Sequence, residues 1–135
     1  MVRKKETPGG RLLTDVELEL MSIIWNQGPT TVKEVADALP KTRPLAYTSV
    51  ATMMKILEHK RYLRCEKDSY AHTFSPLVDK AAYEESCLDH VVDNVFDGEP
   101  VALVQRLLTA KRLSAAERRA IEATLRELAS AKKQA

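Results

Sequence analysis

The stretch YTSVATMMKIL at residues 47–57 decides the fold, because it carries two helix faces of opposite character. One face is apolar and recurs at helical spacing, which predicts contact with a core: Val50, Met54 and Leu57, with Ala51 and Ile56 beside them. The other face carries small hydrogen-bonding side chains at Thr48, Ser49 and Thr52, followed by Lys55. We therefore predict a helix from about residue 47 to residue 60 that packs on one side and presents polar groups on the other.

Two further helices are predicted before this stretch. Residues 14–17 (Thr-Asp-Val-Glu) form a capping box at the start of the first helix, and Gly28-Pro29 ends it. Residues 31–34 repeat the Thr-x-x-Glu spacing, and Pro40 closes a short second helix.

After the third helix the apolar period changes from that of a helix to that of a strand. Residues 62–67 and 70–75 each alternate, and a polar Asp68-Ser69 turn separates them, which is typical of a β-hairpin. With a two-residue turn, Cys65 would pair opposite His72. Three helices followed by a hairpin are the order of a winged helix-turn-helix, so the predicted fold class is mostly α with a small β-hairpin.

The rest of the chain is predicted to be helical. Residues 79–96 form one helix, Asp97-Gly98 breaks it, Pro100 opens the next, and residues 114–117 make a third capping box. Such thin helices bury their own apolar faces poorly, which predicts a homodimer. The expected contacts are Leu88, Val91, Val92, Val95, Leu103, Leu107, Ile121, Leu125 and Leu128. The alternative is that these helices fold back on the winged helix.

Three parts follow from this reading. Residues 1–12 are a flexible N-terminal arm, residues 13–76 a winged-helix DNA-binding domain, and residues 77–135 a helical dimerisation domain. The net charge is only +2, but residues 41–67 hold seven Lys and Arg against two Glu. A basic cluster confined to one segment favours a surface that contacts phosphates, although a merely solvated basic face is the alternative.

The third helix also has the side chains that reading DNA requires. The major groove of B-form DNA is about 12 Å wide and admits one helix, whose outer face must carry small donors and acceptors. Thr48, Ser49, Thr52 and Lys55 meet this requirement, and Lys67 near the hairpin tip can reach an adjacent phosphate. These features predict binding to double-stranded DNA.

Several stretches together resemble the penicillinase repressor family (BlaI/MecI/CopY-type). They are LTDVELELM at residues 13–21, IW at 24–25, TVKEV at 31–35, YTSVATMMKIL at 47–57 and KRYL at 60–63. The resemblance runs from about residue 12 to the end of the chain, and it is specific in the first 76 residues. It implies a winged-helix repressor that binds dyad-symmetric operator DNA as a homodimer.

The resemblance also implies roles for individual residues. The base-reading positions are Tyr47, Thr48, Ser49 and Thr52. The positions that approach the DNA backbone are Lys41, Arg43, Lys55, Lys60, Lys67 and Tyr70. The family often has Gly-Arg at the wing tip, where this chain has Ser69-Tyr70.

Relief of repression is expected through a signal that acts on the C-terminal domain. The resemblance implies relief by cleavage in the C-terminal domain, which in classical members of the family falls at an Asn-Phe bond. The cleavage is made by a membrane sensor-protease or downstream of one, so a sensor-protease would be a further partner. Arg106-Leu107 stands at that cleavage position here. The copper-responsive branch carries a C-terminal Cys-x-Cys pair that this sequence lacks, which disfavours copper sensing.

Two other functions remain open at this point. A metal- or thiol-responsive regulator would use Cys65 with His72 or Cys87 with His90, but each pair falls short of the four ligands of a structural zinc site. A winged helix can also be a protein-interaction module, which an acidic or apolar outer face would indicate. Catalytic signatures are absent from the sequence, and no enzyme activity, metal or cofactor is expected.

The sequence also bears on where the protein works. Its apolar runs fall well short of the roughly 20 residues that span a bilayer, and the basic start is followed by Pro8-Gly9-Gly10 rather than an apolar segment. We therefore expect a cytoplasmic protein without membrane insertion, in which both cysteines remain reduced.

Overall fold

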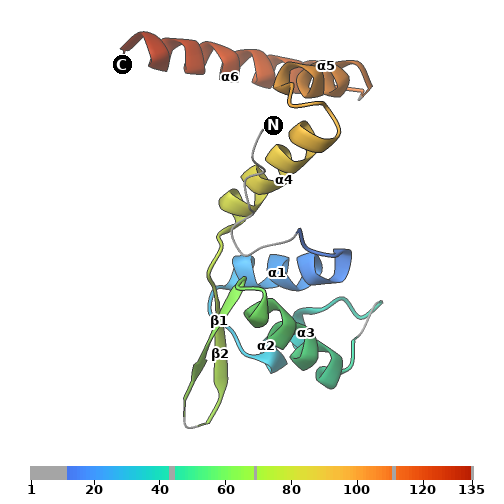
Figure 1. Ribbon diagram of the computed structural model, residues 1–135, viewed down its shortest axis with the longest axis vertical. Coiled ribbons are helices and arrows are strands. Elements are labelled where there is room, and N and C mark those ends of the chain that lie inside the picture. Colours follow the sequence, from blue (N-terminus) through green and yellow to red (C-terminus); the bar gives the residue numbers. More distant parts are fainter. Residues whose placement is uncertain (1–11, 43–44, 69, 111, 135) are drawn as a thin grey trace. The chain divides into compact units, whose positions relative to one another are not determined.

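A computed structural model describes residues 12–42, 45–68, 70–110 and 112–134. Its elements follow in the order α1 (Asp15–Gln27), α2 (Val32–Ala38), α3 (Tyr47–His59), β1 (Leu63–Lys67), β2 (His72–Pro76), α4 (Lys80–Asn94), α5 (Pro100–Ala110) and α6 (Ala115–Gln134) (Figure 1). The chain divides into two compact units, residues 1–91 and residues 92–135. The predicted arm lies outside the described residues, apart from Leu12.

The predicted start signals of the first two helices are confirmed in part. Thr14 Oγ1 accepts from the Glu17 amide at 3.3 Å and Glu17 Oε1 accepts from the Thr14 amide at 2.9 Å, a complete capping box. Gly28 ends α1 with a φ of 82°, a left-handed conformation that glycine adopts without strain. At α2, Thr31 accepts from the Glu34 amide, but the Glu34 carboxylate accepts from the Thr31 hydroxyl instead of reaching the backbone.

The core of the first unit lies between the three helices and the hairpin. Its buried apolar side chains are Leu20, Met21, Ile24, Val35, Leu39, Val50, Met54, Leu57, Tyr62, Leu63, Phe74, Val78 and Tyr83. The predicted inner face of α3 is confirmed, because Val50, Met54 and Leu57 are fully buried. The expectation for Ile56 is wrong: it is 42% exposed, because helical geometry turns it about 100° away from its neighbour Leu57.

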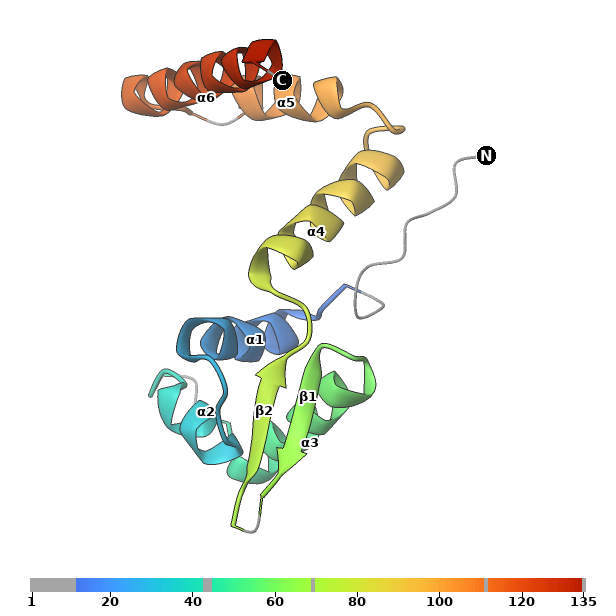
Figure 2. The same ribbon diagram turned by 90° about the vertical axis from the view of Figure 1, so that its left-hand side faces the viewer.

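The hairpin forms from two antiparallel strands (Figure 2), but its register differs from the prediction. Cys65 pairs with Phe74, and Lys67 pairs with His72. The expected pairing of Cys65 with His72 is therefore wrong. The connection spans residues 68–71 instead of two residues, and the Asp68 amide donates to the Ala71 carbonyl oxygen at 3.1 Å.

A contact outside the hairpin accounts for this register. Thr30, in the connection between α1 and α2, exchanges two backbone hydrogen bonds with Phe74, at 2.8 and 3.0 Å. The bridge fixes β2 against the helices and accompanies burial of the Phe74 side chain. A slip of β2 along β1 would break both bonds and move the Phe74 ring from its place in the core.

The first unit continues past the hairpin into α4. The Trp25 indole Nε1 donates to the Val78 carbonyl oxygen at 2.8 Å, and the Leu13 amide donates to the Tyr83 hydroxyl at 3.0 Å. Packing therefore extends beyond residue 76, where the DNA-binding domain was expected to end. The division into a DNA-binding domain at residues 13–76 and a dimerisation domain at residues 77–135 stays a prediction.

The second unit holds the end of α4 and the helices α5 and α6. Asp97 and Gly98 both adopt positive φ where α4 ends, and Pro100 opens α5 as predicted. Ser114 and Glu117 form the expected capping box of α6, with the two bonds at 2.9 and 3.1 Å.

Helices α1 to α3 followed by the hairpin make up a winged helix-turn-helix, with α2 and α3 as its helix pair and β1–β2 as its wing. The predicted fold class is confirmed as mostly α with one small β-hairpin. Among the described residues, no helix combines the length and the apolar character needed to cross a membrane.

Candidate nucleic-acid interface

The outward side of α3 is polar and open to solvent. Thr48, Ser49, Thr52 and Lys55, which we call the reading face, are all exposed. The buried stripe of the same helix holds it to the core, so the reading face is carried on a rigid element. One bond lies within this face: Thr52 Oγ1 donates to the Thr48 carbonyl oxygen at 2.9 Å.

The wing extends beside α3 and carries polar side chains to its tip. Lys67 at the end of β1 is exposed, and Tyr70 in the connection is fully exposed. Tyr47, at the first turn of α3, is 57% exposed, and Lys41 is exposed before it. Arg43, predicted as a backbone contact, lies outside the described residues.

A cavity of about 530 Å³ lies between the helix pair and the wing. Tyr47 and Lys55 line it from α3, Tyr70 and His72 from the wing side, and Lys33 from α2. Sequence reasoning missed Lys33 because it considered only the basic cluster at residues 41–67. Lys33 lies early in α2, the first helix of the pair, and this place in the sequence could have indicated a cation beside the DNA.

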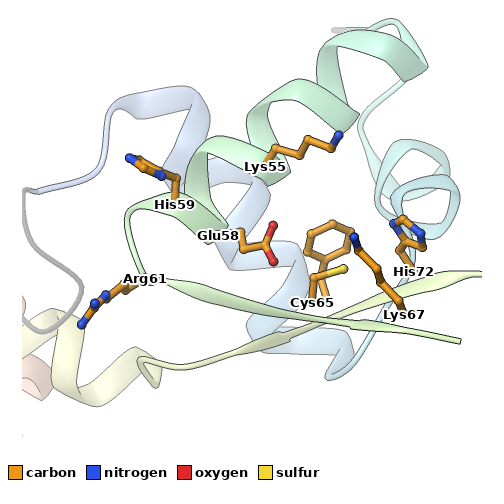
Figure 3. A pocket seen from close by; sticks show the side chains of 8 residues that line it. Lys55, Glu58, His59, Arg61, Cys65, Lys67 and His72 are labelled. Atoms are coloured by element: carbon orange, nitrogen blue, oxygen red, sulfur yellow. The ribbon is translucent and has the colours of Figure 1, made fainter.

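A second cavity, of about 680 Å³, lies between the later half of α3 and the inner face of the hairpin (Figure 3). Lys55, Lys67 and His72 bring positive or ionisable groups to it, and Glu58 points toward the Cys65 thiol. Burial raises the pKa of Cys65, and the nearby Glu58 carboxylate raises it further. The thiol is therefore held in its protonated, less reactive form.

Lys60 occupies a different environment from the other predicted backbone contacts. Its ammonium Nζ lies 2.7 Å from Glu17 Oε2, and the Glu17 side chain is buried. Burial by itself raises the pKa of Glu17. The hydrogen bonds from Lys60 and Thr14, together with the positive charge of Lys60, more than offset burial and lower the pKa. The ion pair joins the end of α3 to the start of α1, so we infer that Lys60 positions the reading helix.

Arg64 is also engaged, since its guanidinium pairs with the exposed Glu66 carboxylate on the same strand. Among the described basic residues of this segment, Lys60 and Arg64 thus have carboxylate partners. Lys41, Lys55 and Lys67 are exposed cations of this segment beside the reading face and wing, and Arg61 is exposed between α3 and β1.

Comparison with known proteins agrees with this geometry. A sequence model of the family described as penicillinase repressor matches residues 13–127. The chain belongs to the penicillinase repressor family. Members of this family are transcriptional repressors and not enzymes.

Individual members of the family cover most of the chain. The penicillinase repressor of Bacillus licheniformis is 26% identical over 122 residues, which are 90% of this chain and 95% of that protein. The transcriptional regulator BlaI of Mycobacterium tuberculosis is 31% identical over 119 residues, 86% of this chain and 84% of that protein. The solution structure of the DNA-binding domain of the repressor BlaI is 29% identical, covers 58% of this chain and 93% of that domain, and has a TM-score of 0.49.

The predicted dimerisation residues of this penicillinase repressor family member lie at or near the surface. No side chain of α5 is buried, and Leu107 is 45% exposed. Leu125 and Leu128 on α6 are exposed by 62% and 63%. Leu88 on α4 and Val95 just after its end are exposed, while the half-buried members of the set are Val91, Val92, Leu103 and Ile121.

The predicted cleavage position, Arg106-Leu107, lies inside α5, and both side chains are exposed. For the metal-responsive alternative, the described residues contain no group of three or more His, Cys, Asp or Glu side chains that could hold a metal ion. Cys87 is half-buried near Tyr83, and His90 is exposed one turn further along α4.

Proposed function

We propose that the chain is a sequence-specific DNA-binding repressor that acts on operator DNA in the cytoplasm. The observation that supports this most directly is the division of α3 into two faces. Val50, Met54 and Leu57 are fully buried, while Thr48 and Thr52 are exposed. A helix anchored on one side and polar on the other is what insertion into the major groove requires.

Each part of the surface has a proposed role. Tyr47, Thr48, Ser49 and Thr52 contact base edges in the major groove. Lys55, Lys67 and Tyr70 flank them and contact phosphates, together with Lys41 and Arg43 from the segment before α3. A phosphate contact by Lys60 stays a prediction, since its ammonium group pairs with Glu17.

The exposed apolar side chains of α4, α5 and α6 favour a homodimer. Side chains such as Leu125 and Leu128 lose contact with water when a second copy covers them. A two-fold dimer would read a dyad-symmetric operator whose half-sites are about 34–36 Å apart or a multiple of that distance.

We further propose that a signal acting on the C-terminal domain relieves repression, through a sensor-protease that cleaves at or near Arg106-Leu107. These residues are exposed, but a helical peptide bond must unwind before a protease can bind it as an extended segment. Cleavage of intact protein should therefore be slow unless α5 opens locally.

A salt titration of binding to duplex DNA tests the proposal. The logarithm of the association constant should fall linearly with the logarithm of salt concentration. Lys55→Ala should reduce the magnitude of that slope by about 0.9, the value of one lost phosphate contact. Lys80→Ala, which removes the same charge from α4, is the matched control and should leave the slope unchanged. Failure to bind duplex DNA at low ionic strength would contradict the proposal.

A further inference from the structure

The hydroxyl hydrogen of Thr52 forms a hydrogen bond within the protein. Thr52 Oγ1 donates to the Thr48 carbonyl oxygen at 2.9 Å, one helical turn earlier, and the side chain is exposed on the reading face. Threonine commonly makes this bond in helices. Toward solvent, Thr52 therefore presents the lone pairs of Oγ1 and its methyl group.

This arrangement favours a hydrogen-bond donor as the partner of Thr52. While the hydrogen stays on the Thr48 carbonyl, Oγ1 can accept from a donor, and the hydroxyl then makes two hydrogen bonds. If the hydrogen turned to an acceptor on DNA, the bond to Thr48 would be lost and the hydroxyl would make one. If the Thr52 hydroxyl donates to DNA, it thus exchanges one hydrogen bond for another. If it accepts from DNA, it gains a hydrogen bond and keeps the one to Thr48.

We infer that Thr52 accepts a hydrogen bond from the exocyclic amine of adenine or cytosine in the major groove. Adenine N6 and cytosine N4 are the donors on the major-groove edges of the bases, whereas guanine O6 and N7 and thymine O4 are acceptors. A base that placed an acceptor against Oγ1 would be disfavoured, because the hydroxyl would have to give up its bond to Thr48 in order to donate to that acceptor. This inference rests on the proposed function and names the chemistry read at one position of the operator.

The competing chemistry at the same side chain is apolar. The Thr52 methyl group could pack against the 5-methyl group of thymine, a contact that threonine also makes with DNA. The two possibilities differ in which atom of Thr52 and which group of the base carry the preference, so removing those atoms one at a time separates them.

The experiment begins with selection of bound duplexes from a random-sequence pool by the wild-type protein. Thr52→Ala removes both the hydroxyl and the methyl group, and the position where its preference weakens is the position that Thr52 reads. Thr52→Val then keeps the branched shape without the oxygen, and Thr52→Ser keeps the oxygen without the methyl group. Unchanged preferences at all other positions show that each variant is folded.

Single groups are then deleted from the DNA at that position. Replacing adenine by purine, or cytosine by pyrimidin-2-one, removes the exocyclic amine, and replacing thymine by uracil removes the methyl group. We expect amine removal to weaken wild-type and Thr52→Ser binding by about three- to tenfold and to leave Thr52→Val unaffected. An A·T pair at this position indicates adenine as the donor, and a G·C pair indicates cytosine.

Two results would overturn the inference while leaving the proposed function intact. One is a loss of affinity on uracil substitution that Thr52→Val shares and Thr52→Ser does not. The other is an equal effect of amine removal on wild type and Thr52→Val. A wild-type protein that binds duplex DNA but selects no sequence would contradict sequence-specific repression itself, and the inference with it.

Discussion

At the scale of single residues, the Glu17 carboxylate is shared between two parts of the fold. Oε1 completes the capping box of α1 with the Thr14 amide, and Oε2 pairs with Lys60 at the end of α3. The carboxylate is buried, so its charge must be compensated by these donors. One side chain therefore sets both where α1 begins and how the end of the reading helix is held.

Glu17→Gln should lower the free energy of unfolding by about 1–3 kcal/mol, which denaturant unfolding at neutral pH can measure. Glutamine can still accept from the Thr14 amide, so the loss reports mainly the ion pair with Lys60. Asp37→Asn, which neutralises an exposed carboxylate on α2, is the control and should change stability little.

The same pair should make stability depend on pH in the acid range. The folded-state pKa of Glu17 is lowered, so its stabilisation is present above the ordinary glutamate value of roughly 4.3 and is lost as pH falls through the folded-state value. Wild-type stability should therefore approach that of Glu17→Gln as the solution is acidified. A constant difference between the two proteins from neutral to acid pH would contradict this assignment.

At the scale of elements, Tyr83 joins α4 to α1. Its hydroxyl accepts from the Leu13 amide just before α1, and its ring lies 5.7 Å from the Trp25 ring and 6.0 Å from the Tyr62 ring, centroid to centroid. Burial raises the pKa of Tyr83 to about 12, although the Leu13 amide lowers it. The first turns of α4 are thus part of the folded winged-helix unit and not a loose connection.

Tyr83→Phe should destabilise the protein by about 1–2 kcal/mol at neutral pH, because the half-buried Leu13 amide loses its partner. The raised folded-state pKa makes the native state retain a proton that the unfolded chain releases, so wild-type stability should fall as pH rises from about 10 toward 12. The two unfolding curves should converge over this range. Tyr70→Phe, at a fully exposed tyrosine, should leave the stability at neutral pH unchanged.

At the scale of the whole molecule, the chain combines one unit with a well-filled core and one whose apolar side chains lie near the surface. The first unit buries residues from α1, α2, α3, the hairpin and α4. Along the described part of α6, every apolar side chain is exposed or half-buried. This contrast is the reason to expect that a second copy completes the C-terminal unit.

Leu125→Asp should convert the protein to a monomer, because dimerisation would bury an unpaired charge. Light scattering should then report the mass of one 15.2 kDa chain instead of two. Ala123→Asp places the same charge on the opposite side of α6 and should leave the dimer intact. A mass that stays at two chains in Leu125→Asp would show that this face of α6 is not the interface.

The residue pattern alone was sufficient for the order of elements, the caps and the anchored face of α3. The capping boxes at residues 14–17 and 114–117 act between side chains and amides three residues apart, so local spacing predicts them. The same spacing at residues 31–34 gives only one of the two bonds of a capping box, from the Glu34 amide to the Thr31 side chain. The buried stripe of Val50, Met54 and Leu57 follows from helical periodicity in the same way. The family resemblance rested on segments in the first part of the chain, among them residues 13–21 and 47–57.

Tertiary contacts decided the rest. The hairpin register depends on Thr30 meeting Phe74, and the place of Lys60 depends on Glu17, which is 43 residues away. Local spacing carries no information about such pairs, because the partners are brought together only when the helices pack. The sequence by itself therefore determined which helix presents a polar face. Only the folded structure decided the register of the wing hairpin and which of the basic side chains remain exposed beside that helix.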